Sequence, residues 1–595
     1  MAPNASRVTS DRVKRVQIRP YDQVFALTQY IINSGLETNW KQMCDSTPSL
    51  GEPFVVTQPG AGTISGAKLD YPRIMVEADF AEAMSGCLYI MCFKAGKFVL
   101  KTSVLDDNGD AKVDDEGEPI VEKTEFNLAG WRIAFAMQLG MTVDERVSDQ
   151  FKQTVLKAGE YSLNQLQAKF ETAIFKPQRS LYGDKTWDQF PQNIKDGLEF
   201  VFQKLKEKLL SKLKGAEKLG SVLKSTKDQG NSAVMTFEPS EIQYQTYPWI
   251  DPQSMGDFKP SSGFEGNQRL NYMLYCETTN GRKLPPVNDR SLPRLGNWTD
   301  GRLAASANSE NTEFGSFHMA RENFFDGYLL RKLRFLNRVM EPTGTWHNVR
   351  LQDIAKIIPH WDSDLSIGNR KDKSESDSFY DWKKESDTKW YFESSITLPR
   401  STDRAGLNGW SGEAWADSKA NCRNVIEFVP GSDIITVSGT SHFEYIYDFT
   451  DKKIIGSNVV SHKELKFDIN WNLTLDLEAV DDGGLQILAT FNEPTISYSR
   501  QDLASQFESA NKIKNAVADA VKDTRKLKEA LAKDLANKQG FVLPAAGVFF
   551  FKNPILSWRG DLICSVAYST VQPEKMMDPN DKTKVNENGV KRITF

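Results

Sequence analysis

The sequence is poor in the residues from which disulfide frameworks and metal centres are built. Of its 595 residues only six are cysteine and five are histidine. The cysteines stand in apolar segments such as GCLYIMCF without paired ligand spacing, which favours buried thiols over disulfides or a zinc site. No stretch approaches the ~18 apolar residues of a membrane span, and the polar start MAPNASRVTSDRVKRVQIRP does not resemble a signal peptide. The expected location is the cytoplasm.

The sequence also lacks an excess of charge of one sign. Lysine and arginine number 74 and aspartate and glutamate 79, for a formal net charge of −5. Nucleic-acid-binding proteins usually carry a marked basic excess, so no nucleic-acid partner is expected. The length exceeds the ~250 to 300 residues that one hydrophobic core supports. We therefore expect a globular chain with at least two domains.

Motifs that carry catalysis or bind metals are missing as well. Neither HExxH nor GxSxG occurs. Ser441 and His442 are adjacent, but neighbouring residues of a strand face opposite sides, which leaves only a triad assembled from distant residues. The acidic run 106–118 begins like a calcium loop, yet Ala111 stands where that loop needs glycine, and a hairpin loop is favoured. The sequence predicts no enzyme, no cofactor and no metal.

What the sequence does contain is long strand-like alternation. Apolar residues occupy every second position from Trp131 to Val143 and again from Leu465 to Leu477. A turn at 481–484 leads from the second run into further alternation, which predicts a long hairpin. A strand of 13 residues spans about 40 Å. We expect antiparallel sheets of such strands to curl strongly around helices.

Apolar residues at helical spacing predict the helices. They cover 21–35, 194–225, 324–340 and 502–538, where steps of three and four form one apolar face. The last helix stops before Gly540 and would be about 55 Å long. The order helix, long strands, helix occurs twice, which indicates an α+β chain of two similar units.

The helix at 194–225 carries a dense row of lysines opposite its apolar face. Lys204, Lys208 and Lys212 belong to this row. Such a face can contact anionic lipid headgroups at a membrane surface. An ordinary solvated helix surface is the more common alternative, and Glu207 and Glu217 interrupt the charge.

Several segments together resemble one known family. They are YDQVFALTQYIINSGL, NQRLNYMLYCETTNGRKLPP, FGSFHMARENFFDGYLLRKL and GFVLPAAGVFFFKNPILSWRGDLICSVAY. They resemble the forty-seven-kilodalton accessory proteins of clostridial neurotoxin gene clusters, members of the tubular lipid-binding (TULIP) superfamily. The resemblance implies long helices wrapped by strongly curled antiparallel sheet, with an elongated apolar groove between them and no catalytic residues. This sequence departs from the family in length, with added charged material at 369–387.

The expected organisation follows from these patterns and the resemblance. A flexible tail at 1–16 precedes a first TULIP-like unit at 17–279, a linker at 280–312 and a second unit at 313–595. The helix at 502–538 either belongs to the second unit or crosses back to the first.

Two functions fit this organisation. One is non-enzymatic binding of a lipid or another elongated hydrophobic ligand, in contact with membrane surfaces. The other is a structural or complex-forming accessory protein, which binds a protein partner and whose grooves are filled by its own side chains. The candidate groove-lining residues are Trp131, Phe135, Met137 and Leu139 in the first unit and Phe467, Ile469, Trp471 and Leu473 in the second. For each of them, ordinary core packing is the commoner alternative.

Overall fold

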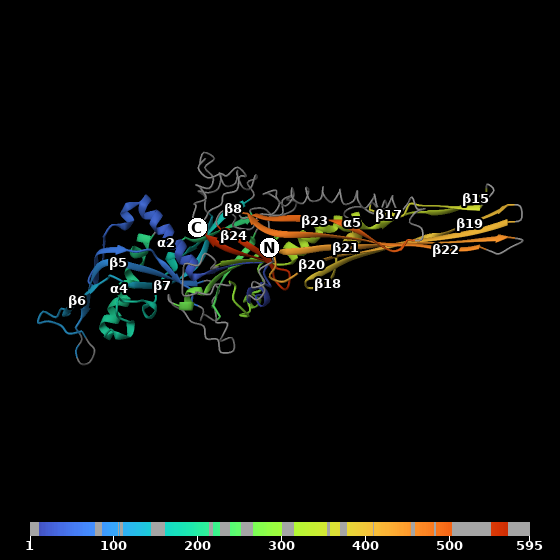
Figure 1. The fold of residues 1–595 in the computed structure, drawn as a ribbon. Helices are drawn as coiled ribbons and strands as arrows, with labels where there is room; N and C mark the ends of the chain where they lie inside the picture. Colours follow the sequence, from blue (N-terminus) through green and yellow to red (C-terminus); the bar gives the residue numbers. More distant parts are fainter. Residues whose placement is uncertain are drawn as a thin grey trace.

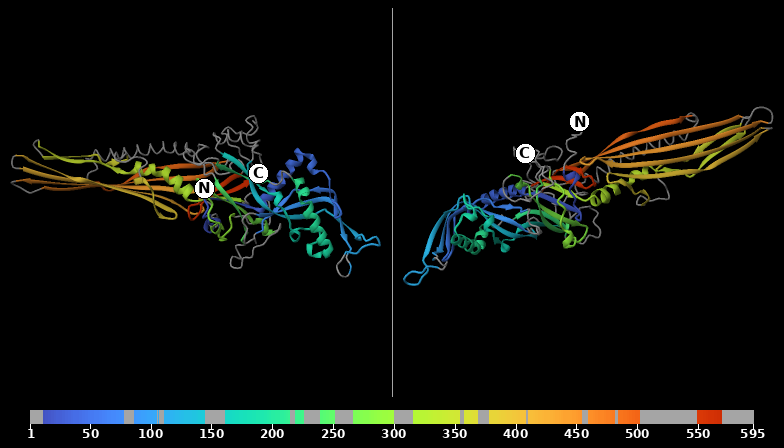
Figure 2. Two further views of the ribbon diagram at one scale, coloured as in Figure 1. Left: turned by 180° about the vertical axis from the view of Figure 1, so that it is seen from behind. Right: turned by 90° about the horizontal axis from the view of Figure 1, so that it is seen from below.

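The molecule is elongated (Figure 1). The computed structural model describes residues 11–77, 86–104, 106, 111–143, 161–213, 218–225, 239–250, 266–299, 315–353, 357–368, 378–407, 410–453, 459–480, 484–501 and 549–568. The first half of the chain, blue to green, lies at one end, and long yellow and orange strands extend to the other (Figures 1 and 2). The fold is α+β with antiparallel sheets, which confirms that part of the prediction.

A six-stranded sheet in the middle of the molecule, the central sheet, takes its strands from distant parts of the chain. Its order is β11 (Pro239–Tyr247), β12 (Tyr272–Thr279), β1 (Gln23–Thr28), β13 (Gly315–Met319), β25 (Leu562–Tyr568) and β24 (Phe549–Leu556). All its neighbouring strands pair antiparallel. Strand β1 is buried along its whole length, because it has a partner on each side and packing on both faces.

The segment 21–35, predicted to be a helix, begins instead with strand β1. Its apolar residues also fit a fully buried strand, and pairing with β12 and β13 selects that alternative. Helix α2 (Gln29–Ser46) starts only after Thr28, whose hydroxyl accepts a hydrogen bond from the Ile31 N–H at 3.3 Å. This contact is an N-cap, which satisfies one of the free donors of the first turn. Gly35 lies inside the helix and does not end it.

A nine-stranded sheet, the first sheet, forms most of the first half of the chain. Its strands are β2 (Phe54–Gln58), β3 (Gly62–Leu69), β4 (Arg73–Met75), β5 (Gly86–Ser103), β6 (Val121–Asn127), β7 (Arg132–Val143), β8 (Tyr161–Ala168), β9 (Ile174–Phe175) and β10 (Lys218–Ser225). Strand β7 confirms the alternation predicted from Trp131 to Val143. Helix α4 (Gln192–Leu210) packs against β5 and β2.

The helix predicted over 194–225 is shorter than expected. Helix α4 ends at Leu210 with a further 3-10 turn at Ser211–Leu213, and Lys218–Ser225 forms β10. Gly220 weakens a helix at this point, and pairing with β8 supplies the backbone hydrogen bonds that a helix would have made. The prediction was wrong here because apolar residues keep a helical spacing beyond Leu213, although the chain forms a strand from Lys218.

The long sheet, β18 to β23, forms the other end of the molecule. It is a meander of β18 (Lys383–Ser386), β19 (Lys389–Leu407), β20 (Trp410–Phe428), β21 (Ile434–Lys453), β22 (Val459–Val480) and β23 (Gly484–Gln501). The predicted hairpin is confirmed as β22 and β23, and both strands are longer than expected. At ~3.3 Å per residue, the 22 residues of β22 span about 70 Å.

The sheets are not strongly curled, so this part of the prediction is wrong. Strands β19 to β23 run side by side as a long open sheet in Figures 1 and 2. Bulges are the usual means of bending a sheet. In the long sheet, β20, β21 and β22 pair in unbroken register over almost their whole lengths, and shifts are confined to β18–β19, β19–β20 and β22–β23. The length of the strands therefore extends the sheet instead of closing it.

The helix predicted at 324–340 is confirmed, with an unexpected first part. A π-helix, η10 (Glu322–Leu329), runs directly into α5 (Leu330–Met340). Phe325 of η10 packs against Trp390 and Phe428 of the long sheet, with ring centroids 4.4 and 5.4 Å apart. The helical segment thus sits on the end of the long sheet that is nearest the central sheet.

Shorter elements complete the described chain. They are helix α1 (Asp11–Lys14), the strand pairs β14 (Pro342–Thr343) with β17 (Ser366–Ile367) and β15 (His347–Asp353) with β16 (Ile357–Ser363), and the 3-10 turns Pro48–Gly51, Phe170–Thr172, Pro177–Arg179, Trp187–Gln189, Gly266–Leu270, Val287–Asp289 and Ser378–Tyr380.

All six cysteines are free thiols, and burial raises the pKa of Cys87 to about 12. In the described ranges, no helix is long and apolar enough to cross a membrane.

Some predictions fall partly or wholly outside the described residues. The helix at 502–538 lies outside them, as do most of the tail and residues 300–314. From the expected linker, Leu292 and Trp298 are buried against the central sheet. The central sheet joins strands from both expected units, and the division into two units stays a prediction.

Candidate functional site

The predicted lining residues of the first unit are core residues of the first sheet. Trp131, Phe135, Met137 and Leu139 are all buried. The Trp131 ring lies 5.0 Å from Tyr182 and 6.4 Å from Phe202 of α4, measured between ring centroids. Phe135 contacts Phe175 at 6.0 Å. The chain's own aromatic side chains therefore fill the space beside these residues.

The predicted lining residues of the second unit lie together on one face of the long sheet. Phe467, Ile469, Trp471 and Leu473 alternate along β22 and are buried. Phe467 stacks on Phe443 of β21, with centroids 5.0 Å apart and planes inclined by 12°. We call this the inner face of the long sheet. The alternation in the sequence placed these residues on a common face correctly.

A glycine makes room for the largest of these side chains. Gly439 is the cross-strand neighbour of both Asn424 and Trp471. A Cβ at Gly439 would lie 2.4 Å from Trp471 Nε1 and 2.4 Å from Asn424 Oδ1, distances far below van der Waals contact. Only a glycine leaves the indole its place on the inner face. This contact could not be predicted from the sequence, because it depends on the register between strands.

Buried polar side chains fix the helical segment to the inner face. Asn424 of β20 donates to Asn337 Oδ1 of α5 at 2.9 Å, and Asn337 donates to the Tyr380 carbonyl at 2.9 Å. Glu341, just after α5, accepts from the Tyr380 hydroxyl at 2.8 Å and from the Ser394 hydroxyl at 2.9 Å. Hydrogen bonds of this kind are costly to break in a buried site. They hold α5 in one place on the sheet.

The helical segment is short compared with the inner face. It consists of η10 with 8 residues and α5 with 11, which together are at most about 28 Å long at 1.5 Å per residue. The strands β19 to β23 have 18 to 22 residues. Among the described elements, β15 also packs on β19 and β20, and β24 packs on β22.

The predicted lysine face lies on α4 and on the 3-10 turn after it, where Lys212 Nζ lies 5.6 Å from the ring centroid of Phe54 in β2. Lys204, Lys208 and Lys212 are exposed, and no carboxylate within the described ranges pairs with them. Lys204 lies over the ring of Phe200, at 5.8 Å, and this phenylalanine is itself 49% exposed. The face therefore combines unpaired cations with an exposed aromatic ring. Contact with a membrane remains a prediction.

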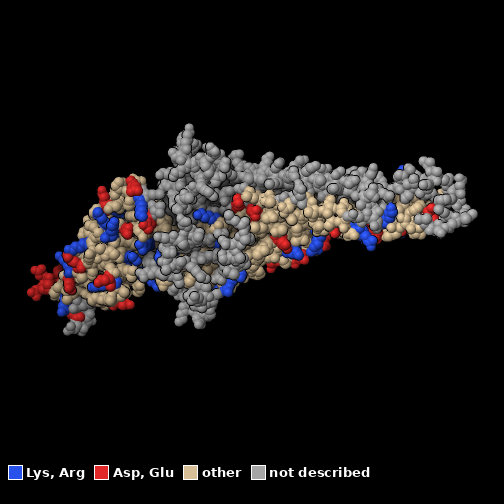
Figure 3. All heavy atoms as spheres, in the orientation of Figure 1, with Lys and Arg blue, Asp and Glu red and all other residues tan. Residues whose placement is uncertain are grey.

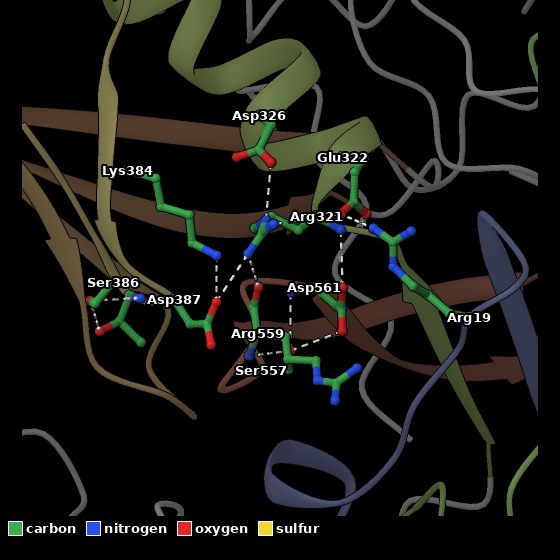
Figure 4. Close-up of polar contacts among 11 residues, drawn as sticks. Arg19, Arg321, Glu322, Asp326, Lys384, Ser386, Asp387, Ser557, Arg559 and Asp561 are labelled. Atoms are coloured by element: carbon green, nitrogen blue, oxygen red, sulfur yellow. Dashed lines mark hydrogen bonds and ion pairs between the residues drawn. The ribbon is translucent and has the colours of Figure 1, made fainter.

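A charged pocket of about 220 Å³ lies where distant segments meet (Figure 4). Arg321, just before η10, contacts Asp326 at 3.0 Å and Asp387 of the β18–β19 turn at 3.5 Å. Its backbone N–H donates to Asp561, in the turn before β25, at 3.0 Å. The contacts of Arg321 thus connect the helical segment, the long sheet and the central sheet.

Most charges around this pocket belong to ion pairs, and the Arg559 guanidinium lies 4.6 Å from the ring centroid of Trp558. Lys384 contacts Asp387 at 2.5 Å, and Arg19 pairs with Glu322. The hydrogen bond from Lys384 lowers the pKa of Asp387, whereas burial raises the pKa of Asp561. Balanced pairs of this kind suit a structural junction better than a reactive site.

Two serine–histidine pairs have the spacing of a nucleophile and its base. Ser418 Oγ of β20 lies 2.8 Å from His347 Nδ1 of β15. In the other pair, Ser316 Oγ lies 3.0 Å from His318 Nε2 in β13. Both side chains are buried, and burial lowers the pKa of His318 to about 3, so the imidazole is neutral. No carboxylate among the described residues contacts His318. The pair satisfies buried polar groups, and the non-enzymatic interpretation stays a prediction.

The acidic run forms a turn in its described part. Asp114 accepts hydrogen bonds from the backbone N–H groups of Glu116 and Glu118, at 3.0 and 2.9 Å. Acidic side chains gather at this end of the molecule in Figure 3, while both signs are interspersed elsewhere on that face. Within the described ranges, no group of three or more His, Cys, Asp or Glu side chains could hold a metal ion.

A hollow of about 400 Å³ lies at the long sheet. Its lining combines polar residues such as Arg423, Thr440 and Asn470 with Gly439 and Trp471, which belong to the inner face.

Comparison with known proteins finds similar proteins only among solved structures. No protein-family model matches the sequence, and no curated protein matches it. P47 of Clostridium botulinum E1 is similar over 93% of this chain and 100% of that one, with 11% identity and a TM-score of 0.37. P47 from Clostridium botulinum A2 is similar over 94% and 99%, with 11% identity and a TM-score of 0.36. A lipopolysaccharide binding protein is similar over 93% and 100%, with 10% identity and a TM-score of 0.31.

The resemblance expected from the sequence is found again in the structure. The clostridial protein is the one whose family the segments quoted above resemble. At these TM-scores the likeness assigns no ligand and no site residue to this chain. A function for this chain is therefore inferred from its own contacts.

Proposed function

We propose that this protein binds a lipid or another elongated apolar molecule, without catalysing a reaction, on the inner face of the long sheet. One observation carries the proposal. The inner face carries alternating apolar side chains along strands of 18 to 22 residues, about 60 to 70 Å, whereas η10 and α5, with 8 and 11 residues, extend over at most about 28 Å. An acyl chain lying between this face and the predicted helix at 502–538 would bury apolar surface on both sides.

The lysines of α4 and of the 3-10 turn after it support delivery or pick-up of such a ligand at a membrane. Lys204, Lys208 and Lys212 are exposed beside an exposed phenylalanine, which suits the surface of an anionic bilayer. The ligand and the membrane would then contact different ends of the same molecule (Figure 1).

Quenching by brominated lipid tests the proposed position of the ligand. Purified protein is titrated with a dibrominated fatty acid, whose bromines quench tryptophan fluorescence on contact. Trp471→Phe should lose part of the quenching seen in the unmodified protein. Trp131→Phe is the matched control and should keep the lipid-dependent quenching, because Trp131 is enclosed by aromatic side chains of the first sheet.

Lipid analysis of the purified protein supplies the second test. Native mass spectrometry and solvent extraction should detect a co-purifying lipid, and the protein should bind liposomes at low salt. If no lipid co-purifies and no liposome or fatty acid binds, the proposal fails.

A structural role in a protein complex is the second candidate. The filled space between α4 and the first sheet favours it, since Trp131 and Phe135 meet only side chains of the chain itself among the described residues. Under this alternative the inner face of the long sheet is filled in the same way. The protein would then purify without lipid and with a protein partner.

A further inference from the structure

A separate pocket lies beside the start of α2. It measures about 340 Å³ and is lined by Gln29, Tyr30, Asn33, Ser34, Glu37, Tyr71, Arg73 and Arg269. Helix α2 supplies the first five, Arg73 begins β4, and Arg269 lies in the 3-10 turn before β12. All of these side chains are polar or aromatic and none is aliphatic. The pocket is therefore unsuited to an acyl chain.

Its two arginines are each held against a tyrosine ring. The Arg73 guanidinium lies 4.8 Å from the Tyr71 ring centroid and donates to the Tyr71 hydroxyl at 2.6 Å. The Arg269 guanidinium lies 4.6 Å from the Tyr30 ring centroid. A guanidinium fixed on an aromatic face loses less freedom when it binds a ligand, because its planar fork is already oriented.

The backbone that carries Arg73 is also fixed. The side chain of Asn33 pairs with both backbone groups of Ile74, accepting from its N–H at 2.7 Å and donating to its carbonyl at 3.0 Å. This two-point contact holds β4 against α2. The position of Arg73 beside the pocket is thus set by hydrogen bonds that do not involve the arginine itself.

Neither arginine has a carboxylate partner within the part of the chain that the structure describes. Elsewhere, exposed arginines of the long sheet are paired, as Arg404 is with Glu413 at 2.8 Å. The acid that lines the pocket, Glu37, is engaged by Lys41 at 2.7 Å. Two guanidinium charges therefore face one cavity with a single, already paired carboxylate beside them.

We infer that this pocket binds a phosphate group, carried by a small soluble phosphomonoester or by a lipid headgroup. Two guanidinium groups match the double negative charge of a phosphomonoester and can each donate two parallel hydrogen bonds to its oxygens. The volume leaves room for a small polar group attached to the phosphate, next to the tyrosine rings and the side chains of Asn33 and Ser34. The site is independent of the inner face of the long sheet and goes beyond the proposed function.

Calorimetric titration of the full-length protein with inorganic phosphate and with glycerol 3-phosphate tests the inference. Vesicles of phosphatidylcholine with and without phosphatidic acid provide the lipid-borne form. Binding should weaken as salt is added, since it depends on charge. Arg73→Gln and Arg269→Gln should each lower the affinity roughly tenfold or more, because each removes charge-assisted hydrogen bonds.

Control variants separate loss of the site from loss of the fold. Arg404→Gln removes the same charge from a distant strand and should leave binding unchanged. Arg269→Lys keeps the charge without the planar fork and should weaken binding less than Arg269→Gln. Thermal melting of each variant, compared with the unmodified protein, shows whether the protein is folded, and Arg269→Gln decides the matter if Arg73→Gln melts early.

Every outcome bears on the inference. Binding of the soluble phosphates alone identifies a soluble ligand, and binding of phosphatidic acid vesicles alone identifies a headgroup; both support a phosphate site. If the unmodified protein binds none of these probes, or if both arginine variants bind as well as it does, the inference is overturned. Trp471→Phe should keep phosphate binding, so failure of the lipid proposal would not affect this result.

Discussion

The first sheet and the long sheet use the same alternating pattern and pack it differently. In the first sheet, α4 packs against β5 and β2, and the ring of its Phe202 lies 6.4 Å from Trp131 and 5.3 Å from Phe175, measured between centroids. In the long sheet, Asn337 and Glu341 fix the end of α5 through buried hydrogen bonds to Asn424 and Ser394. The same apolar alternation is thus packed by aromatic rings of a helix in one region and is joined to its helix by polar side chains in the other.

The largest expected effect comes from emptying the core of the first sheet. Phe202→Ala should lower the free energy of unfolding by about 3 to 5 kcal/mol, because the ring is buried and its loss leaves a cavity. Phe200→Ala, two residues away on the exposed side of α4, should cost at most about 0.5 kcal/mol. Urea denaturation measures both. Equal effects would mean that α4 does not fill this sheet.

The next effect tests the space that Gly439 leaves for Trp471. Gly439→Ala should cost about 1 to 3 kcal/mol, because the added methyl overlaps the indole and forces the inner face to repack. Gly51→Ala is the control, since a Cβ there meets no atom within 4 Å. Thermal and urea unfolding compare the pair. A neutral Gly439→Ala would show that the inner face is loosely packed around Trp471.

Breaking the polar contact that docks α5 should have a similar or smaller effect. Asn337→Leu leaves the buried Asn424 amide and the Tyr380 carbonyl without a partner, at a cost of about 1 to 3 kcal/mol. Asn421→Leu changes an exposed residue of β20 and should be nearly neutral. Hydrogen exchange of α5 should rise only in the first variant. Unchanged exchange would assign the docking of α5 to apolar contacts alone.

A pH series tests the central sheet that joins the two regions. Burial raises the pKa of Glu277 well above its ordinary value, so its protonated form is favoured in the folded protein. Its contribution to stability is then fully present below the unfolded pKa of ~4.5 and is lost as pH rises toward the folded pKa. Glu277→Gln should therefore melt at a higher temperature than the unmodified protein at pH 8, with a smaller difference at pH 4.

The exposed Glu427→Gln is the control for this series, and its melting temperature should follow that of the unmodified protein at each pH. A Glu277→Gln variant that is less stable at pH 8 would mean that the buried carboxylate is ionised and paired.

The smallest effect on stability is expected on the lysine face of α4. Changing Lys204, Lys208 and Lys212 to Glu should alter the free energy of unfolding by at most about 0.5 kcal/mol, because all three are exposed. Binding to anionic liposomes should be abolished, since each basic residue near such a surface contributes about 1 kcal/mol. Lys101, Lys112 and Lys123 changed to Glu form a control of equal charge. Liposome binding lost equally in both variants would point to net charge and not to this face.

The sequence predicted those features that depend on neighbouring residues. The alternation in β7 and β22 is a local signal, and both strands lie where it placed them. Strand β1 was missed, because QVFALT fits helix and buried strand alike and only pairing with β12 and β13 decides. The same reason hides Gly439, Asn337 and Arg73. Their neighbours come from strands and helices far away in the sequence.

The order of synthesis matters for the central sheet. Strand β13 pairs on one side with β1, which leaves the ribosome early, and on the other with β25 at 562–568. Until β25 has been made, the outer edge of β13 has no described partner and remains open to wrong pairing. Contacts that join residues more than 200 positions apart also slow folding, because a long loop must close first. Truncations before residue 562 should therefore yield an aggregation-prone chain even though the long sheet is complete.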